Sequence, residues 1–444
     1  MPVTRPETTI TRQMLAGFRK SVEARPECRV AMNACTNGNI KDLALNRQAL
    51  NALDWEFSHE VPHGQITAQR QAGTCWLFAA LNWLRKAPMK KLNLENFEFS
   101  QNYCIFWDKL EKANRFLEDM IEYRDRELDD RRVHALLNSP LPDGGEWHML
   151  TALVRKYGLL PKAAMADTFH GGLTDVMNPL LFFKLREGAM RIRELHRKGK
   201  GEHELRKAKI EVLETLYRML VVFLGEPPAR FDFGYRDKKK RFHRAVGLTP
   251  HTFYEKYVGV ELDRYVSLLS SPLPDTPFGR TFVIEHNKND VEGPDGVFLN
   301  VPMETLHRIA VAVTQKGALL FGCDVLQSAH RPKGILDTEL FDFEEFFGTT
   351  FEMDRATRMA TFQMKHTHAM VFLGVDMVGG KAAKWKVENS WGPDVGQGGV
   401  FVMTDRWFLE NVYGIIVHEK QIPRELRAKL SLPPIVLPTW HPLA

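Results

Sequence analysis

The sequence predicts an α+β fold, in which a helical half and a β-rich half are separated by a helical insertion. Residues before about 175 carry apolar side chains at helical spacing, and the segment from about 179 to 225 keeps this spacing but becomes highly charged. The last third contains short apolar segments bounded by glycines, which are typical of antiparallel strands. Together these regions favour one mixed chain over an all-α or all-β protein.

Composition sets limits on the class of protein. The chain has 444 residues, 44% hydrophobic and 26% charged, enough for two or three domains of roughly 150 residues each. A net charge of +5 is small, so the whole-chain balance does not indicate a nucleic-acid partner. Five scattered cysteines without metal-binding spacing indicate a reducing compartment. Without a signal peptide or a membrane-length apolar run, we expect a cytoplasmic protein with no membrane partner.

The first 175 residues are expected to be mainly helical. Residues 1–60 form a predicted arm that packs on the core, with a helix over 10–24 and turn-rich sequence at 33–39. Residues 61–175 form a predicted helical lobe. In it the buried helix WLFAALNWLRK begins directly after Cys75, and a second helix covers about 101–124.

Residues 176–260 are predicted to be a helical and basic insertion that serves oligomerisation. Two charged helices separated by Gly199-Lys200-Gly201 indicate a helical hairpin, and the second helix carries an apolar stripe. That stripe consists of Leu213, Leu216, Tyr217 and Leu220. The dense basic run at 236–244 is expected to be a solvated loop or an interface segment.

Residues 261–430 are predicted to form a β lobe, and residues 431–444 a C-terminal tail. The segments HAMVFLGVD, KWKVENSW and GVFVMTD are short and β-rich. Trp385 and Val387 alternate with Lys386 and Glu388, as expected for half-buried antiparallel strands.

A cysteine nucleophile needs a lowered pKa, a neighbouring base and a group that orients the base. Cys75 lies at a predicted helix N-terminus, which favours its thiolate. His368 begins one predicted strand and Asn389 ends the next, so an antiparallel pair would bring them together. Gln69 lies close enough to share an oxyanion with the Cys75 backbone N–H, and Trp391 can cover the His368–Asn389 bond.

Long ordered segments make the chain resemble the papain superfamily, and within it the bleomycin hydrolase and aminopeptidase C branch. The matching segments are AQRQAGTCWLFAALN, MKKLNLENFEFSQNY, DGGEW, KYGLLPK, LGEPP, YRDKKK, FGCDV, THAM, KWKVENSWG and MTDRWF. The resemblance implies a two-lobed papain-like fold and a cysteine aminopeptidase with possible bleomycin amide hydrolysis. It also implies that Cys75 is the nucleophile, His368 the base, Asn389 its orienting residue and Gln69 the oxyanion-hole residue.

Two departures from other papain relatives follow from the same resemblance. His368 follows Cys75 by 293 residues, whereas a minimal papain-type chain needs only about 130–150. The surplus corresponds to the insertion, which in this branch builds a homohexamer. Ala72 stands where secreted relatives carry a disulfide cysteine, which favours the cytosolic branch.

The C-terminus and one glycine pair are candidate substrate-binding segments. In the family, the chain end lies in the active-site cleft, so Ala444 is expected to meet the free amino group of a peptide substrate. The tail LPTWHPLA is shorter than in the family and has His441 in place of an acidic residue. Gly144 and Gly145 resemble a glycine strand that lines the cleft, although a plain turn explains them equally well. We group Trp391 with these substrate-binding candidates.

Other residues are assigned structural roles. We expect His366, two residues before His368, to point to the other face of the strand, away from the site. Cys28, Cys35, Cys104 and Cys323 lack a helix start or a neighbouring base. No metal and no organic cofactor is implied. Two alternative functions stay open, which are a thiol acyltransferase with the same residues and a basic ring that binds nucleic acid.

Overall fold

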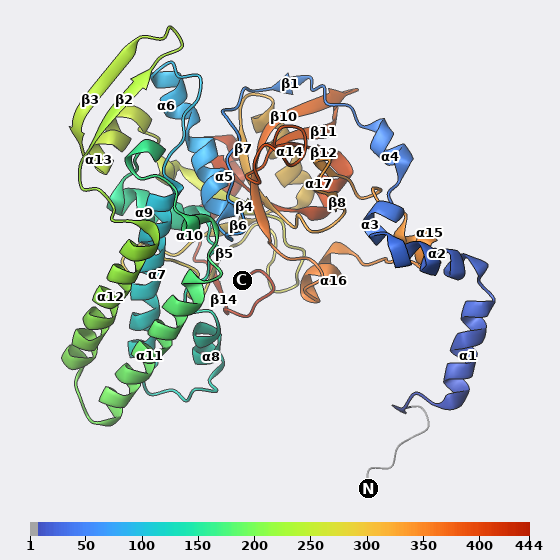
Figure 1. The fold of residues 1–444 in the computed structure, drawn as a ribbon, viewed down its shortest axis with the longest axis horizontal. Helices are drawn as coiled ribbons and strands as arrows, with labels where there is room; N and C mark the ends of the chain where they lie inside the picture. The colour runs from blue at the N-terminus through green and yellow to red at the C-terminus, as the bar shows by residue number, and fades with distance from the viewer. Residues whose placement is uncertain (1–7) are drawn as a thin grey trace.

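A computed structural model describes residues 8–444, and its ribbon is drawn in Figure 1. The first seven residues of the predicted arm lie outside the described residues. The rest of the arm contains α1 (Arg12–Glu23), α2 (Pro26–Asn37), α3 (Ile40–Leu43) and α4 (Arg47–Ala52). No residue of α1 or α2 is buried, and α1 projects away from the body of the molecule (Figure 1).

The predicted turn at 33–39 is wrong, because α2 continues through most of this segment. Pro26 occupies the first turn and Glu27 follows it, and both residue types favour a helix start. The asparagines at 33 and 37 therefore lie within the helix, and the chain leaves it only at Gly38.

The helical region carries the predicted helices at nearly the predicted limits. Its elements are α5 (Cys75–Leu84), α6 (Lys86–Lys91), α7 (Gln101–Glu122), α8 (Arg131–Asn138), α9 (Trp147–Tyr157) and α10 (Phe169–Gly172). Ser100 caps α7 by accepting a hydrogen bond from the backbone N–H of Tyr103 at 3.1 Å. Almost every side chain of α5 is buried, which fixes this helix in the interior.

The predicted helical hairpin consists of α11 (Met177–Arg197) and α12 (Glu202–Leu224). Both helices pack against α7, and the three lie side by side in Figure 1. The basic run at 236–244 is a solvated loop only in its middle, residues 237–241. Its ends belong to β2 (Phe231–Arg236) and β3 (Phe242–Leu248), which form an antiparallel hairpin with the lysines in the turn.

Within residues 8–444, twelve strands form one sheet in the order β14-β5-β6-β4-β13-β7-β10-β11-β12-β9-β8, with β1 (His59–Glu60) paired to β10. Its other strands are β4 (Tyr265–Leu269), β5 (Thr281–Ile284), β6 (Phe298–Asn300), β7 (Leu319–Cys323), β8 (Ala329–His330), β9 (Ile335–Leu336), β10 (His368–Val378), β11 (Lys381–Glu388), β12 (Val400–Thr404), β13 (Val412–His418) and β14 (Ile435–Leu437). The helices between them are α13 (Pro250–Phe253), α14 (Met303–Thr314), α15 (Phe343–Phe347), α16 (Arg355–Ala360), α17 (Asp405–Asn411) and α18 (Arg424–Ala428).

Two large hydrophobic clusters form the core. One gathers side chains from α5, α7, α9, α11 and α12, and the other gathers side chains from the sheet with α14 and α17. The mixed α and β content predicted from the sequence is therefore confirmed. None of the helices in the described part of the chain is long and apolar enough to cross a bilayer.

Candidate active site

A cavity of about 610 Å³ brings together several residues singled out in the sequence. Its lining comes from the start of α5, the loop before α9, β7, the start of β10, β13 and the C-terminal tail. Cys75 and His368 both line it, as do the two glycines and the chain end, which are Gly144, Gly145 and Ala444.

Cys75 is the first residue of α5, so its thiol lies at the positive end of the helix dipole. The pKa of this thiol is nevertheless raised, against the lowering expected for a cysteine at a helix start. The reason is that burial outweighs the hydrogen bonds from the backbone N–H groups of Ala369 and Trp76, which lower it. The bond from Ala369 brings the sulfur next to the residue that follows His368. Helix α5 also packs directly on β10, which carries that histidine. This packing brings the start of the helix to the start of the strand.

His368 and Asn389 are joined by a hydrogen bond of 2.8 Å between Nε2 and Oδ1. Because the Asn389 oxygen can only accept, Nε2 must carry the proton and Nδ1 keeps its lone pair. Strands β10 and β11 pair antiparallel, and Asn389 directly follows the last residue of β11. The predicted juxtaposition of the two side chains is therefore present.

Burial lowers the pKa of His368 to about 4, although its hydrogen bond to Asn389 acts in the opposite direction. The shifts of His368 and Cys75 together leave one proton on the pair over a wide pH range. In this range the sulfur carries the proton and the imidazole is neutral. The arrangement can thus supply a sulfur nucleophile and a base that holds its proton.

Trp391 lies directly beside His368, and its grouping with the substrate-binding candidates stays a prediction. Its ring stacks on that of His368 with centroids 4.8 Å apart and an angle of 30° between planes. The guanidinium of Arg331 lies 4.6 Å from the Trp391 ring centroid. The indole therefore covers one face of the imidazole, as the sequence suggested.

Gln69 lies beside the same corner but is engaged within the protein. Its Nε2 donates to the Ala72 carbonyl at 2.8 Å, and its Oε1 accepts from the Ser390 hydroxyl at 2.6 Å. Its backbone N–H donates to the Ser390 carbonyl at 2.8 Å. These bonds tie the segment before Cys75 to the residue after Asn389. Gln69 is absent from the lining of the cavity, and one of its two amide hydrogens remains for another acceptor.

The two glycines that line the cavity differ in whether a side chain would fit at their positions. A Cβ at Gly145 would lie 2.5 Å from Cε2 of Trp76, so the close approach of the indole requires a glycine there. A Cβ at Gly144 would meet no atom within 4 Å among the described residues. Only Gly145 is thus required by packing, and the space beside Gly144 is open.

The C-terminal tail enters the cavity and is anchored at several points. Strand β14 pairs in parallel with β5, and the ring of Trp440 lies 4.2 Å from the Arg131 guanidinium. Nε2 of the buried His441 lies 3.1 Å from Asp275 Oδ2. Ala444 then lines the cavity with its main-chain N–H bonded to the His441 carbonyl at 2.8 Å. The histidine that replaces the family's acidic residue thus helps to hold the tail.

The expectation that His366 faces away from the site is wrong. It precedes β10 and lines the cavity, because side chains two positions apart on extended backbone lie on the same side. Its Nδ1 lies 3.4 Å from Glu146 Oε1, and its ring stacks on Tyr413 with centroids 5.5 Å apart. Burial lowers the pKa of His366, but the Glu146 carboxylate outweighs this effect and raises it above its ordinary value.

Sequence reasoning missed the Glu146–His366 pair altogether. Glu146 follows the two glycines directly, and its negative charge contributes to the raised pKa of the Cys75 thiol. The partners lie 220 positions apart, and no local motif joins them. The one available signal was an acidic residue, Glu146, directly after the two glycines of the candidate cleft wall.

Comparison with known proteins gives a consistent result over the whole chain. A family model described as the Peptidase C1-like family matches residues 9–444. The chain is 39% identical to aminopeptidase C of Listeria monocytogenes over 438 residues, covering 98% of this chain and 99% of the relative. It is 36% identical to bleomycin hydrolase of Gallus gallus over 445 residues, with 98% of each covered.

A solved structure is also similar throughout. The crystal structure of PepW from Lactobacillus rhamnosis matches with a TM-score of 0.96 and 39% sequence identity. The match covers 98% of this chain and 99% of that one.

Proposed function

The chain belongs to the Peptidase C1-like family and is a cysteine peptidase of the aminopeptidase C and bleomycin hydrolase group, and from this premise we propose how its residues act. In this proposal it removes N-terminal residues from peptides. The single observation that carries the proposal is the shared cavity, in which the Cys75 thiol, the His368 ring and the chain end meet.

The proposed reaction begins when Nδ1 of His368 takes the thiol proton and the Cys75 sulfur attacks the first peptide carbonyl. The tetrahedral intermediate collapses as the imidazolium donates this proton to the leaving amine, which leaves a thioester on Cys75. Nδ1 then takes a proton from water, the hydroxide attacks the thioester, and the sulfur leaves with the proton restored. Asn389 keeps the ring oriented through its bond to Nε2.

The oxyanion would be stabilised by the Cys75 backbone N–H and the Gln69 side-chain amide. Cys75 opens α5, where backbone N–H groups have no partner within the helix. The bond that the Gln69 amide donates to Ala72 and the one that it accepts from Ser390 hold it beside this helix start. Fixed donors of this kind stabilise the charge that develops in the transition state.

Selection for a free amino terminus is assigned to the chain end. A carboxylate and an ammonium about 4 Å apart attract each other by about 4 kcal/mol at an effective dielectric constant of about 20, before desolvation. Because about 1.4 kcal/mol corresponds to a factor of ten, part of this energy is enough to favour unblocked substrates. A tail held by Trp440 and His441 would also stop longer peptides from binding across the cavity.

The finer architecture is part of the same proposal. We assign residues 61–175 to a helical lobe and 261–430 to a β lobe of a papain-like enzyme, with 176–260 as the insertion. The two large hydrophobic clusters support this division. The unburied faces of α1 and α2 support assembly with further copies of the chain, for which we propose a homohexamer.

The test compares free and N-acetylated aminoacyl amides as substrates for the wild type, Cys75→Ala and a chain lacking Ala444. We expect the wild type to prefer the free amine, Cys75→Ala to be inactive, and removal of Ala444 to reduce the preference. An active Cys75→Ala variant would exclude the proposed nucleophile. An unchanged preference without Ala444 would exclude the C-terminal carboxylate as the group that selects substrates.

A further inference from the structure

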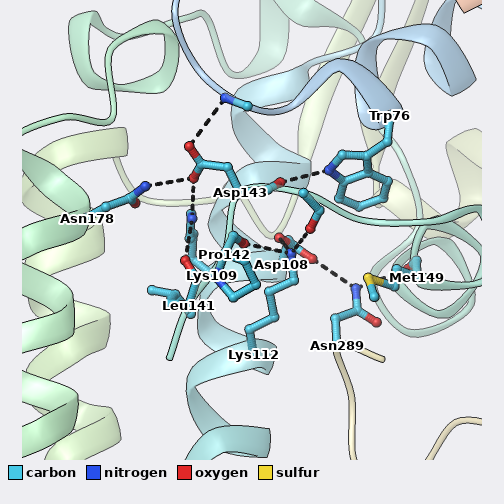
Figure 2. Close-up of polar contacts among 12 residues, drawn as sticks. Trp76, Asp108, Lys109, Lys112, Leu141, Pro142, Asp143, Met149, Asn178 and Asn289 are labelled. Carbon is cyan, nitrogen blue, oxygen red and sulfur yellow. Dashed lines mark hydrogen bonds and ion pairs between the residues drawn. The ribbon is translucent and has the colours of Figure 1, made fainter. Parts of the chain in front are cut away.

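One wall of the cavity is a loop whose backbone is held by side chains from two helices. This wall loop, residues 141–145, includes both cavity glycines, and Figure 2 shows its first three residues with their contacts. Four consecutive carbonyls each accept a hydrogen bond, namely Leu141 from Lys109 (3.2 Å), Pro142 from Lys112 (3.0 Å), Asp143 from Trp76 Nε1 (2.9 Å) and Gly144 from Lys112 (2.6 Å). The loop has no regular secondary structure, but each of these four carbonyls is held by its own hydrogen bond to a side chain.

The carboxylate of Asp143 connects this wall to the segment that leads to the nucleophile. It accepts hydrogen bonds from Lys109 at 2.5 Å, from Thr174 at 2.7 Å and from Asn178 at 2.8 Å. It also accepts the backbone N–H of Gly73 at 3.3 Å, two residues before Cys75. Burial alone would raise the pKa of Asp143, but the Lys109 ammonium and these bonds hold it well below its ordinary value.

The two lysines are buried to an extent that stability alone does not explain. The side chains of Lys109 and Lys112 are 1% and 5% exposed. Lys112 pairs with Asp108 at 2.7 Å, and Asp108 is held in turn by Asn289 at 3.0 Å (Figure 2). Burying ion pairs costs desolvation energy, and apolar residues of similar size often give equal or greater stability. Such a cluster therefore points to a geometric role.

The end of the wall loop at the cavity is Gly145, which the lysines do not engage directly. The backbone N–H and C=O of Gly145 have no hydrogen-bond partner among residues 8–444, and Gly145 lines the cavity. Gly145 packs against the Trp76 ring, and the hydrogen bonds to the carbonyls of residues 141–144 fix the backbone that leads to it. The carbonyls of residues 141–144 are engaged within the protein, so Gly145 has the only carbonyl of the wall loop that is left for a ligand.

We propose that Lys109 and Lys112 are positioning residues that hold the wall loop in the conformation that binds the substrate backbone. This inference rests on the proposed peptidase function. A loop ordered before binding saves the substrate the entropic cost of ordering it. Lys112 is itself part of the cavity lining, but its ammonium is bonded to Asp108 and to two loop carbonyls. Both lysines therefore act through the loop and not on the reacting atoms. Their loss therefore weakens substrate binding and leaves the thiol chemistry intact.

The test separates binding from chemistry in Lys112→Met. We expect the KM for an aminoacyl amide to rise about tenfold, the effect of losing roughly one charged hydrogen bond. The rate at which iodoacetamide alkylates Cys75 is expected to stay within about twofold of the wild type, because the reagent does not need the loop. Lys209→Met is the matched control, since Lys209 also bonds α7 side chains, Asn114 at 2.9 Å and Glu118 at 2.6 Å, but does not line the cavity.

A second variant covers the case in which Lys112→Met does not fold. Asp108→Asn/Lys112→Met removes both charges of the pair, so no unpaired carboxylate stays behind, and the same rise in KM is expected. A KM within twofold of the wild type in the folded variant overturns the inference. So does a fall in alkylation rate that parallels the loss of hydrolysis. A wild type that hydrolyses no aminoacyl amide refutes the proposed function instead, which distinguishes the two failures.

Discussion

At the scale of single residues, the proton shared by Cys75 and His368 sets the pH range of activity. Burial raises the pKa of the thiol and lowers that of the imidazole to about 4. The active pair holds one proton, and a second proton on His368 removes the base. We therefore expect kcat/KM to be maintained well below pH 6.5 and to fall as the pH drops through about 4. A profile of kcat/KM from pH 3.5 to 9 measures this.

The pH profile needs a control for unfolding, because the lowered pKa of His368 also makes the stability of the fold depend on pH. His368 has a lower pKa in the folded chain than in the unfolded one, so the unfolded state binds more protons between about pH 6.5 and 4. Stability therefore decreases as the pH falls through this window. Activity regained on return to pH 7 separates titration of the site from unfolding. An acid limb centred near pH 6.5 would contradict the prediction.

Trp391 gives a second prediction at this scale. Its ring covers one face of His368, so we expect its loss to act on the base more than on substrate binding. For Trp391→Ala we expect kcat to fall about tenfold, equivalent to about 1.4 kcal/mol, with KM nearly unchanged. Trp391→Phe keeps a stacked ring and should retain most activity. A rise in KM with constant kcat would instead indicate a direct contact with substrate.

Single residues differ in how far the sequence predicts their surroundings. Cys75 and His368 each lie at the start of one element, and periodicity alone locates such starts. The bond from His368 to Asn389 then follows from pairing two adjacent strands. The contact of Glu146 with His366 joins a loop to a strand end far along the chain, and no local pattern encodes it.

At the scale of elements, β11 shows a limit of alternating patterns. Glu388 lies at a position that the alternation predicts to be exposed, yet its side chain is 0% exposed. The reason is a buried ion pair with Arg85, the C-cap residue that follows α5, at 2.5 Å. This pair joins the end of the helix that begins with Cys75 to the residue before Asn389. A charged side chain in a strand pattern does not reveal such a partner.

The pair predicts a large effect on stability. Arg85→Met leaves the Glu388 carboxylate buried without its partner, which typically costs about 3–5 kcal/mol. We expect this loss in the free energy of unfolding measured by urea denaturation. Arg218→Met is the control, because Arg218 and Glu214 form an exposed pair on α12, with side chains 60% and 69% exposed. Such pairs contribute about 0–1 kcal/mol, and equal losses in both variants would contradict the prediction.

The charge pattern did not predict the two strands of the β2–β3 hairpin. The basic residues between 236 and 244 suggested a solvated loop, but Phe231 and Phe233 are buried against the helical core. Their alternation with Asp232 and Gly234 is a strand pattern that lies just before the basic run. The charges form the turn, and the flanking aromatic residues determine the element.

At the scale of the whole molecule, long-range pairing is what the sequence could not predict. Strand β14 near the chain end pairs with β5, about 150 positions earlier, and no local signal specifies this register. The mixed class and the helical hairpin were predictable, because each depends on local periodicity. The position of the tail in the cavity was expected from family resemblance alone, and the pairing with β5 together with the His441–Asp275 contact gives its physical cause.

The N-terminal arm leads to the last prediction, which concerns assembly. Helix α1 is amphipathic, yet none of its residues is buried in the single chain, and Phe18 is 53% exposed. Exposed apolar faces of this kind mark protein–protein contacts. We expect light scattering to give about six times the 51.0 kDa of one chain. Leu15→Glu/Phe18→Glu should reduce this mass without unfolding the chain, because neither side chain contributes to its core.

Val378→Glu is the matched control for this double variant. Val378 ends β10 and is 63% exposed, but it belongs to neither the arm nor the helical hairpin. Its substitution adds a charge at an exposed apolar site outside the proposed contact, so the mass should remain that of the wild type. A wild type of 51.0 kDa, or a double variant with unchanged mass, would show that the arm does not hold the copies together.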